Sequence, residues 1–294
     1  MVDECINMRK SLKAWFLLSP ALIIIILFNL LPLARTVFLS FQSSSLNNSH
    51  FIGLENYITV LTDSRFHQAI YNTAIYALAV VPIGLIISLI IAAILYDFKK
   101  FQVVFEVIFF MPYIISTVAK GSIFRLLLNE DYGIINNILG WFNIMPINFL
   151  DDPEIALLTI IIFGIWSSLG FNIVILLSGL RNLNSQYYKM ASVCGANKFQ
   201  QFWLITLPQL LPIITFLLTV NCINSFRIYT EVYTIFNGKA GIGYSAITAV
   251  YYIYDKFYVV NRYGEGMAAA VILFMLILIF TIIQNLILRK LTRR

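Results

Sequence analysis

Polar side chains interrupt two long apolar runs of this sequence, and their chemistry suits contact with a hydroxylated solute. An asparagine amide both donates and accepts hydrogen bonds, so it can bind hydroxyl groups, and a tryptophan ring can stack on the apolar face of a sugar. Because polar groups at membrane depth are costly, they often mark a pathway. The candidates are Trp166, Ser168, Gly170 and Asn172 in the run 154–180, and Asn221, Asn224 and Ser225 in the run 203–226.

A packing role competes with the pathway role at these positions. Serine and glycine let helices approach closely, and asparagine can bond to a neighbouring helix. Packing is the simpler interpretation of Ser168 and Gly170, whereas both roles stay open for Asn221 and Asn224. All seven residues remain candidates for a substrate path.

Lys120 is a charged residue in the outer part of another apolar run, 103–128. A partner of opposite charge is the simpler explanation for such a residue. The alternative is a selectivity role, in which Lys120 favours an anionic substrate such as an acidic sugar or a glycerol phosphodiester. Arg227 and Glu231 follow the run 203–226 four residues apart. We interpret these two as an ion pair on one helix.

The residues that an enzyme would need are absent from the sequence or scattered along it. There are two histidines, His50 and His67, and no HExxH motif, so a zinc hydrolase is not expected. Gly238-Lys239 lacks the preceding glycine and the following Ser or Thr of a nucleotide-binding P-loop. The three cysteines form neither a disulfide framework nor a metal site by their spacing. The sequence predicts no catalytic residue, no bound metal and no bound cofactor.

The elements that position the candidates are membrane-spanning helices. The chain of 294 residues is 60% hydrophobic and 12% charged, with a mean hydropathy of +0.84. Apolar runs of about 20 residues are long enough to cross a bilayer as helices. The first run is too long for the apolar part of a signal peptide, so we expect it to be an uncleaved span. The six predicted spans are 14–41, 66–96, 103–128, 154–180, 203–226 and 267–288.

The charges predict the orientation of these spans. Six spans place the tail 1–13 and the basic tail 289–294 on one side, and the loop 42–65 on the other. Lys and Arg favour the cytoplasmic side, so both termini are expected to be cytoplasmic. The net charge of +6 is interpreted as this bias, and no nucleic-acid partner is expected. The basic residues on the side of the termini are Arg9, Lys10, Lys13, Lys99, Lys100, Arg181, Lys189, Lys198, Arg289, Lys290, Arg293 and Arg294.

An amphipathic segment precedes the fifth span on the predicted cytoplasmic side. Tyr187, Met190, Ala191 and Cys194 follow the i, i+3, i+4, i+7 spacing of one helical face. Gly195 can end such a helix in the left-handed conformation. Taken alone, the pattern fits an interfacial connector without a partner.

The residues around Gly195 add a resemblance to a known family. Gly195 is followed after nine residues by Ile205-Thr206-Leu207-Pro208, which looks like the signature loop of binding-protein-dependent ABC importer permeases. Lys189-Met190-Ala191 stands where that family has Glu-Ala-Ala, and Cys194 where many members have Asp. The stretches 51–57, 72–73 and 180–183 are also similar to the maltose-type and glycerol-phosphate-type carbohydrate permeases.

The resemblance implies a type I importer permease fold in the plasma membrane of a prokaryote and uptake of a sugar by alternating access. It also implies a second homologous permease subunit, two ABC ATPase subunits that use Mg-ATP, and an extracytoplasmic solute-binding protein. The amphipathic helix would be the coupling helix that docks on the ATPase. Its expected coupling residues are Tyr188, Lys189, Ala191, Ser192, Gly195, Ala196 and Asn197.

Two alternatives stay open at this point. The first is an ABC permease for another solute, such as glycerol phosphate or a peptide. The second is a self-contained secondary transporter, which often contains internal repeats and broken helices in matching halves. No internal repeat is recognisable here, so the second alternative is the weaker one.

Overall fold

The computed structural model describes residues 15–43, 50–98 and 102–292. The predicted tail 1–13 and the basic residues Lys99, Lys100, Arg293 and Arg294 lie outside the described residues. The contacts divide the chain into two compact units. The first consists of the described part of 1–62 and Ile253–Phe274, and the second of Asp63–Tyr252 and the described part of 275–294.

The described chain is built from helices, with one isolated antiparallel bridge between Gln42 and Phe51. Among the described residues, five helices are long and apolar enough to span a membrane, and a strongly bent pair makes a sixth if it is one span. The predicted all-helical class is therefore confirmed. The five helices are Trp15–Leu39, Ser64–Asp97, Ala156–Arg181, Lys198–Phe226 and Tyr263–Leu288.

In the first unit, the side chain of Asn56 hydrogen-bonds to the backbone at the end of the first predicted span. The unit contains η1 (Ile26–Leu30), α2 (Leu31–Leu39), α3 (Glu55–Thr62), η4 (Asp255–Val259) and the start of α14 (Tyr263–Thr292). The buried Asn56 amide donates to the carbonyl oxygens of Ser40 at 2.8 Å and Gln42 at 2.7 Å. A Cβ at Gly264 would lie 2.6 Å from both Asn56 Nδ2 and the Gln42 oxygen. This crowding explains why a glycine stands there.

The second unit has a core formed by α4 (Ser64–Asp97), α8 (Ala156–Arg181) and α11 (Leu207–Phe226). Leu85 of α4, Leu176 and Leu180 of α8, and Leu210 and Leu217 of α11 are buried together. Burial of such side chains is the main contact between these helices inside the unit. The side chain of Asp63 accepts a hydrogen bond from the backbone N–H of Arg65 and so begins α4.

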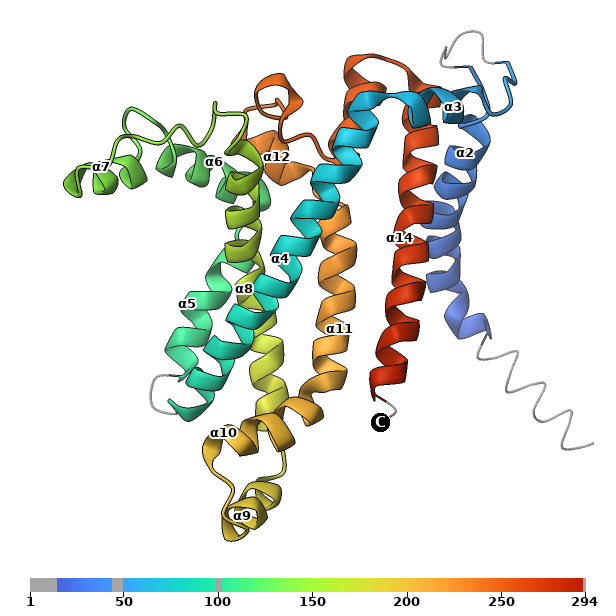
Figure 1. The fold of residues 1–294 in the computed structure, drawn as a ribbon. Helices are drawn as coiled ribbons and strands as arrows, with labels where there is room; N and C mark the ends of the chain where they lie inside the picture. Colours follow the sequence, from blue (N-terminus) through green and yellow to red (C-terminus); the bar gives the residue numbers. More distant parts are fainter. Residues whose placement is uncertain (1–14, 44–49, 99–101, 293–294) are drawn as a thin grey trace, which may run out of the picture. The chain divides into compact units, whose positions relative to one another are not determined.

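The predicted span 103–128 is not one straight helix. It is divided into α5 (Gln102–Ile114) and α6 (Thr117–Leu127), which meet at an angle of 98°. Pro112 removes a backbone donor near the end of α5, and Ser116 has an extended backbone with ψ of 136°. Helical bonding therefore stops at Ile114 and starts again at Thr117. The bend turns α6, the helix that contains Lys120, away from the axis of α5 (Figure 1).

The loop after α8 contains α9 (Ser185–Val193) and α10 (Lys198–Gln201), followed by the π-helix η2 (Phe202–Thr206) and α11. Pro208 lies in the first turn of α11 and has no N–H for the carbonyl of Leu204. Directly before it the chain makes a π-helical turn, in which the N–H of Leu207 donates to the carbonyl oxygen of Phe202. Figure 1 shows α9 and α10 at one end of α8, and α7 (Ile134–Trp141) and α12 (Thr230–Ile235) at the other.

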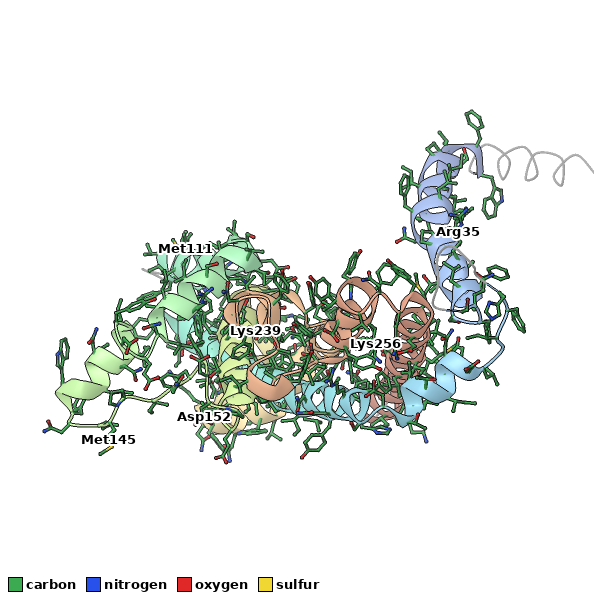
Figure 2. The ribbon with its side chains drawn as sticks, turned by 90° about the horizontal axis from the view of Figure 1, so that it is seen from above. Arg35, Met111, Met145, Asp152, Lys239 and Lys256 are labelled. Atoms are coloured by element: carbon green, nitrogen blue, oxygen red, sulfur yellow. The ribbon has the colours of Figure 1, made fainter. Side chains whose placement is uncertain are left out.

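Irregular segments cover the end of the second unit away from α9. Figure 2 places Met145 and Asp152 on the connection between α7 and α8, and Lys239 on the segment after α12. The segment continues through η3 (Ile242–Tyr244) to α13 (Ala249–Tyr254). Asn72 of α4 fixes it by donating to the carbonyl oxygens of Ser245 at 2.8 Å and Ile247 at 3.0 Å.

Candidate functional site

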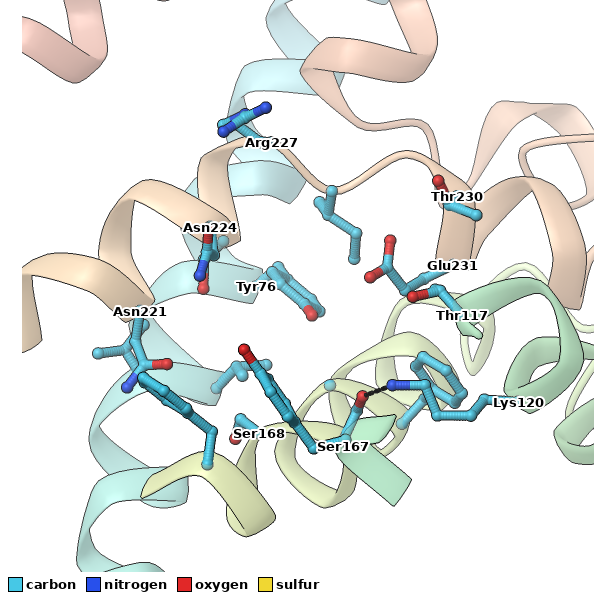
Figure 3. Close-up of a pocket in the computed structure, with 18 of the residues that line it drawn as sticks. Tyr76, Thr117, Lys120, Ser167, Ser168, Asn221, Asn224, Arg227, Thr230 and Glu231 are labelled. Carbon is cyan, nitrogen blue, oxygen red and sulfur yellow. Dashed lines mark hydrogen bonds between the residues drawn. The ribbon is translucent and has the colours of Figure 1, made fainter. Parts of the chain in front are cut away.

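A cavity of about 560 Å³ lies inside the second unit, between α4, α5, α6, α8, α11 and α12. Its wall is a mixture of aromatic rings, hydroxyls, amides and charged groups (Figure 3). A cavity of this size can hold a small oligosaccharide unit or another polar solute. The polar and charged side chains in its wall belong to Tyr76, Tyr113, Thr117, Lys120, Ser167, Ser168, Asn221, Asn224, Ser225, Arg227, Thr230 and Glu231.

The amide groups of the cavity and the charged pair Lys120 and Glu231 lie at opposite ends (Figure 3). In the close-up of Figure 3, the amides of Asn221 and Asn224 lie at one end, and Lys120 and Glu231 lie at the other. The Asn221 amide donates to Asn172 Oδ1 at 2.8 Å. This bond fixes the orientation of the Asn221 amide, because the buried Asn172 is held within α8.

The charged end of the cavity is formed where α6 meets α12. A Cβ at Gly121 would overlap Thr234 Oγ1 and would lie 2.7 Å from Thr234 Cβ, so only a glycine allows this approach. Lys120 directly precedes Gly121, and its ammonium donates to Ser167 Oγ of α8. Burial raises the pKa of the Glu231 carboxyl, while hydrogen bonds from backbone N–H groups and the charge of Lys120 lower it.

The α9 loop presents an exposed apolar surface that the second unit does not cover. Tyr187, Met190 and Val193 are exposed by 52%, 66% and 89%. The loop itself is well ordered by hydrogen bonds. Asn184 begins α9 by accepting from the N–H of Gln186 at 2.9 Å, and Gly195 ends it with φ of 82°. An exposed apolar strip on an ordered helix is typical of a docking surface.

Side-chain hydrogen bonds join α9 to the start of the fifth span. The hydroxyls of Tyr188 and Thr206 are 2.8 Å apart, which links α9 to η2. The Gln201 amide donates to Ser192 Oγ and to the carbonyl oxygen of Ala196, both at 3.0 Å. Asn197 forms a capping box with Gln200 and begins α10. These bonds connect α9 to η2, which continues into α11.

Comparison with known proteins decides the family. The family of binding-protein-dependent transport system inner membrane components matches residues 84–293, which is more than half of the chain. The chain belongs to this family. It is a multi-helix inner-membrane permease subunit, and the resemblance predicted from the sequence is confirmed.

Relatives of this permease cover nearly its whole length. The arabinooligosaccharides transport system permease protein AraP of Bacillus subtilis is 29% identical over 282 residues, which are 94% of this chain and 88% of that protein. The lactose transport system permease protein LacF of Rhizobium radiobacter is 31% identical over 284 residues, which are 92% of this chain and 95% of that protein.

A solved structure has the same fold as the permease. It is the crystal structure of a bacterial alginate ABC transporter in complex with an alginate pentasaccharide-bound periplasmic protein. The TM-score is 0.84 at 22% identity, and the match covers 97% of each chain. The predicted importer permease fold is therefore confirmed.

The structure brings part of the predicted substrate path together. Of the predicted path residues, Ser168, Asn221, Asn224 and Ser225 line the cavity of the permease, and so does Lys120, the candidate for a selectivity charge. These five residues come from α6, α8 and α11, and the bend between α5 and α6 sets the place of Lys120.

The other predicted path residues lie away from the cavity wall. Trp166 packs its ring near those of Phe124 at 5.4 Å and Phe163 at 6.0 Å. Asn172 accepts the hydrogen bond from the Asn221 amide and so fixes a residue of the wall. A Cβ at Gly170 would overlap the carbonyl oxygen of Phe109, so Gly170 permits α5 and α8 to pack. For Gly170 the structure favours the packing role.

Several wall residues carry no mark in the sequence, and one predicted ion pair, Arg227 with Glu231, is wrong. Tyr76 and Tyr113 are aromatic residues inside apolar runs, where nothing in the spacing marks a cavity. The predicted pairing of Arg227 and Glu231 on one helix is wrong, because α11 ends at Phe226 and α12 begins at Thr230. Both side chains line the cavity instead. The sequence does offer a signal for their place in the cavity wall. Arg227 and Glu231 follow directly after a span whose last turns contain two asparagines.

Proposed function

We propose that this permease carries a sugar or a short oligosaccharide inward as the membrane subunit of an ATP-binding-cassette importer. The observation that carries the proposal is the cavity walled by amides, hydroxyls and aromatic rings in a chain of this family. Such groups bind the hydroxyls and the apolar ring faces of saccharides. The names of the relatives, which transport arabinooligosaccharides and lactose, support the same class of substrate.

The proposed transport cycle depends on other subunits. Two ATPase subunits bind Mg-ATP and close on it, and a second homologous permease completes the pathway. A solute-binding protein delivers the substrate from outside the cytoplasm; the periplasmic protein in the solved complex of the alginate transporter supports this arrangement. With both termini on the cytoplasmic side, α9 faces the ATPase, and this chain binds no cofactor itself.

In this cycle α9 is the coupling helix. Tyr188 and Ser192 hold it to η2 and to Gln201. Lys189, Ala191 and Gly195 shape the surface that meets the ATPase, and Ala196 and Asn197 connect it to α10. Closure of the ATPase pair moves α9, and α9 moves α11, which carries Asn221 and Asn224 in the cavity wall.

Affinity purification of the tagged chain in mild detergent, followed by mass spectrometry, tests this assembly. The proposal predicts that an ABC ATPase and a second permease are recovered with it. Recovery of the chain alone, under conditions in which a related importer stays assembled, would contradict the proposal and favour a self-contained carrier.

Replacing Tyr188 by phenylalanine should weaken the coupling of transport to ATP hydrolysis. The change removes the hydrogen bond to Thr206 and keeps the ring, and a single bond of this kind contributes about 1 kcal/mol. We expect about a fivefold lower ratio of solute imported to ATP hydrolysed, since that energy corresponds to such a factor. Tyr132→Phe is the control, because Tyr132 is exposed by 64% and lies between α6 and α7, outside the docking surface of α9. If Tyr188→Phe left the ratio of solute imported to ATP hydrolysed unchanged, the bond between Tyr188 and Thr206 would have no part in coupling.

A further inference from the structure

The wall of the cavity contains more positive than negative side chains, with Lys120 and Glu231 at one end and Arg227 near Asn224 (Figure 3). Lys120 and Arg227 contribute two cations to the wall, and Glu231 contributes one carboxyl. Figure 3 shows the Lys120 side chain extended across its end of the cavity toward Ser167. A neutral saccharide does not require this excess of cations.

Lys120 is the decisive residue, because it is buried without an anionic partner in contact. Its exposed fraction is 5%, and among the described residues its ammonium donates to the neutral hydroxyl of Ser167. Within that same described structure, Glu231 lies beyond ion-pair distance of Lys120. An ammonium has three N–H donors, so two of them stay available to a bound ligand. Burial of an ammonium without an anionic partner is strongly unfavourable, and an anionic ligand would relieve this penalty.

Glu231 is a counter-charge at a distance from Lys120. Its side chain is partly buried, and burial favours the neutral form of an acid, whereas the charge of Lys120 favours the ionised form. The hydroxyls of Thr117 and Thr230 lie at the same end of the cavity as Lys120 and can donate to an anion. The other end offers the neutral amides of Asn221 and Asn224.

We propose that the permease selects a saccharide with an acidic group, and that Lys120 is the specificity-determining residue that binds this group. The carboxylate or sulfonate of the sugar lies against Lys120, Thr117 and Thr230, while its hydroxyls lie against the amides of Asn221 and Asn224. The proposal rests on the proposed sugar-import function. A charge-assisted bond in a water-poor cavity is among the stronger hydrogen bonds in proteins.

A double-label uptake experiment tests this selectivity in cells that contain the intact importer. The cells receive a mixture of digalacturonate with one isotope and its carboxyl-reduced, neutral counterpart digalactose with another. The readout is the ratio of acid to neutral disaccharide taken up. Lys120→Met keeps the length of the side chain and removes its charge. Lys239→Met is the matched control, because Lys239 lies on the segment after α12 and does not line the cavity.

The wild type is expected to favour the acid, and Lys120→Met should lower the ratio about tenfold, as expected for one lost buried charge contact. Lys239→Met should leave it unchanged. Uptake of the neutral sugar in Lys120→Met shows that this variant is folded and assembled. A wild type that prefers the neutral sugar, or an equal loss of both sugars in Lys120→Met, would overturn the inference and leave the import function intact. If deletion of the chain changes the uptake of neither sugar, the proposed function fails with it.

Discussion

Replacing Val193 by lysine is expected to release the ATPase subunits from the permease and to abolish ATP-driven uptake. Val193 is 89% exposed at the end of α9, three residues after the exposed Met190. If this strip docks in a groove of the ATPase, the change buries an ammonium without a partner, which costs several kcal/mol. We expect at least about a tenfold loss of ATPase recovered with the tagged chain, since 1.4 kcal/mol corresponds to tenfold.

The fold of the loop should survive this change. A surface substitution usually alters stability by less than about 0.5 kcal/mol, and a positive charge near the C-terminus of a helix is favourable. Gln186→Lys places the same charge on the same helix, at an exposed position that is already polar. This control should retain the ATPase. Equal retention in both variants would mean that the apolar strip is not the docking surface.

Replacing Gly170 by alanine is expected to destabilise the whole second unit. The new Cβ would overlap the carbonyl oxygen of Phe109 and would meet Phe110 Cα at 3.1 Å, and backbone atoms cannot move aside as a side-chain tip can. Overpacking of this kind costs about 1–3 kcal/mol. The melting temperature of the purified permease should fall by several degrees, with less protein in the membrane.

A second glycine provides the control for this variant. Gly140 lies in α7, and in the described part of the chain no neighbouring atom lies within 4 Å of the position that a Cβ would take there. Gly140→Ala should leave the melting temperature unchanged or raise it, because alanine is the better helix former. A normal melting temperature for Gly170→Ala together with an altered range of substrates would favour the substrate-path role of Gly170 over the packing role.

The spans are predictable from the sequence because their signal is local. An apolar run of the right length has few alternatives to a helix in a membrane, so α4, α8 and α11 lie close to the predicted spans. The α9 helix is predictable for a similar reason, since the spacing of Tyr187, Met190 and Gly195 is a local pattern.

The bend between α5 and α6 depends on contacts that the sequence does not display. Pro112 indicates that helical bonding is weakened, but it does not determine the angle. The angle also depends on the approach of Gly121 to Thr234, which lies more than a hundred residues further along the chain. The sequence therefore predicts Lys120 in a straight span, and its position near Glu231 and Ser167 could not be foreseen.

The composition of the cavity wall is predictable only in part, for the same reason. Trp166 and Ser168 are two residues apart in α8, yet Ser168 lines the cavity and Trp166 packs on Phe124 and Phe163. Which face of a helix meets a cavity depends on its neighbours when the helix is apolar all round. Asparagines in α11 give the better signal, because a buried amide needs a partner or a ligand.

Sugar import by this permease can be measured as uptake into proteoliposomes that contain the purified permease with the subunits recovered beside it. Labelled oligosaccharide, bound to its solute-binding protein, is supplied on one side, and Mg-ATP on the other. We predict accumulation that requires ATP hydrolysis and every one of these subunits. Accumulation by this chain alone, driven by an ion gradient and indifferent to ATP, would contradict the account and identify a secondary transporter.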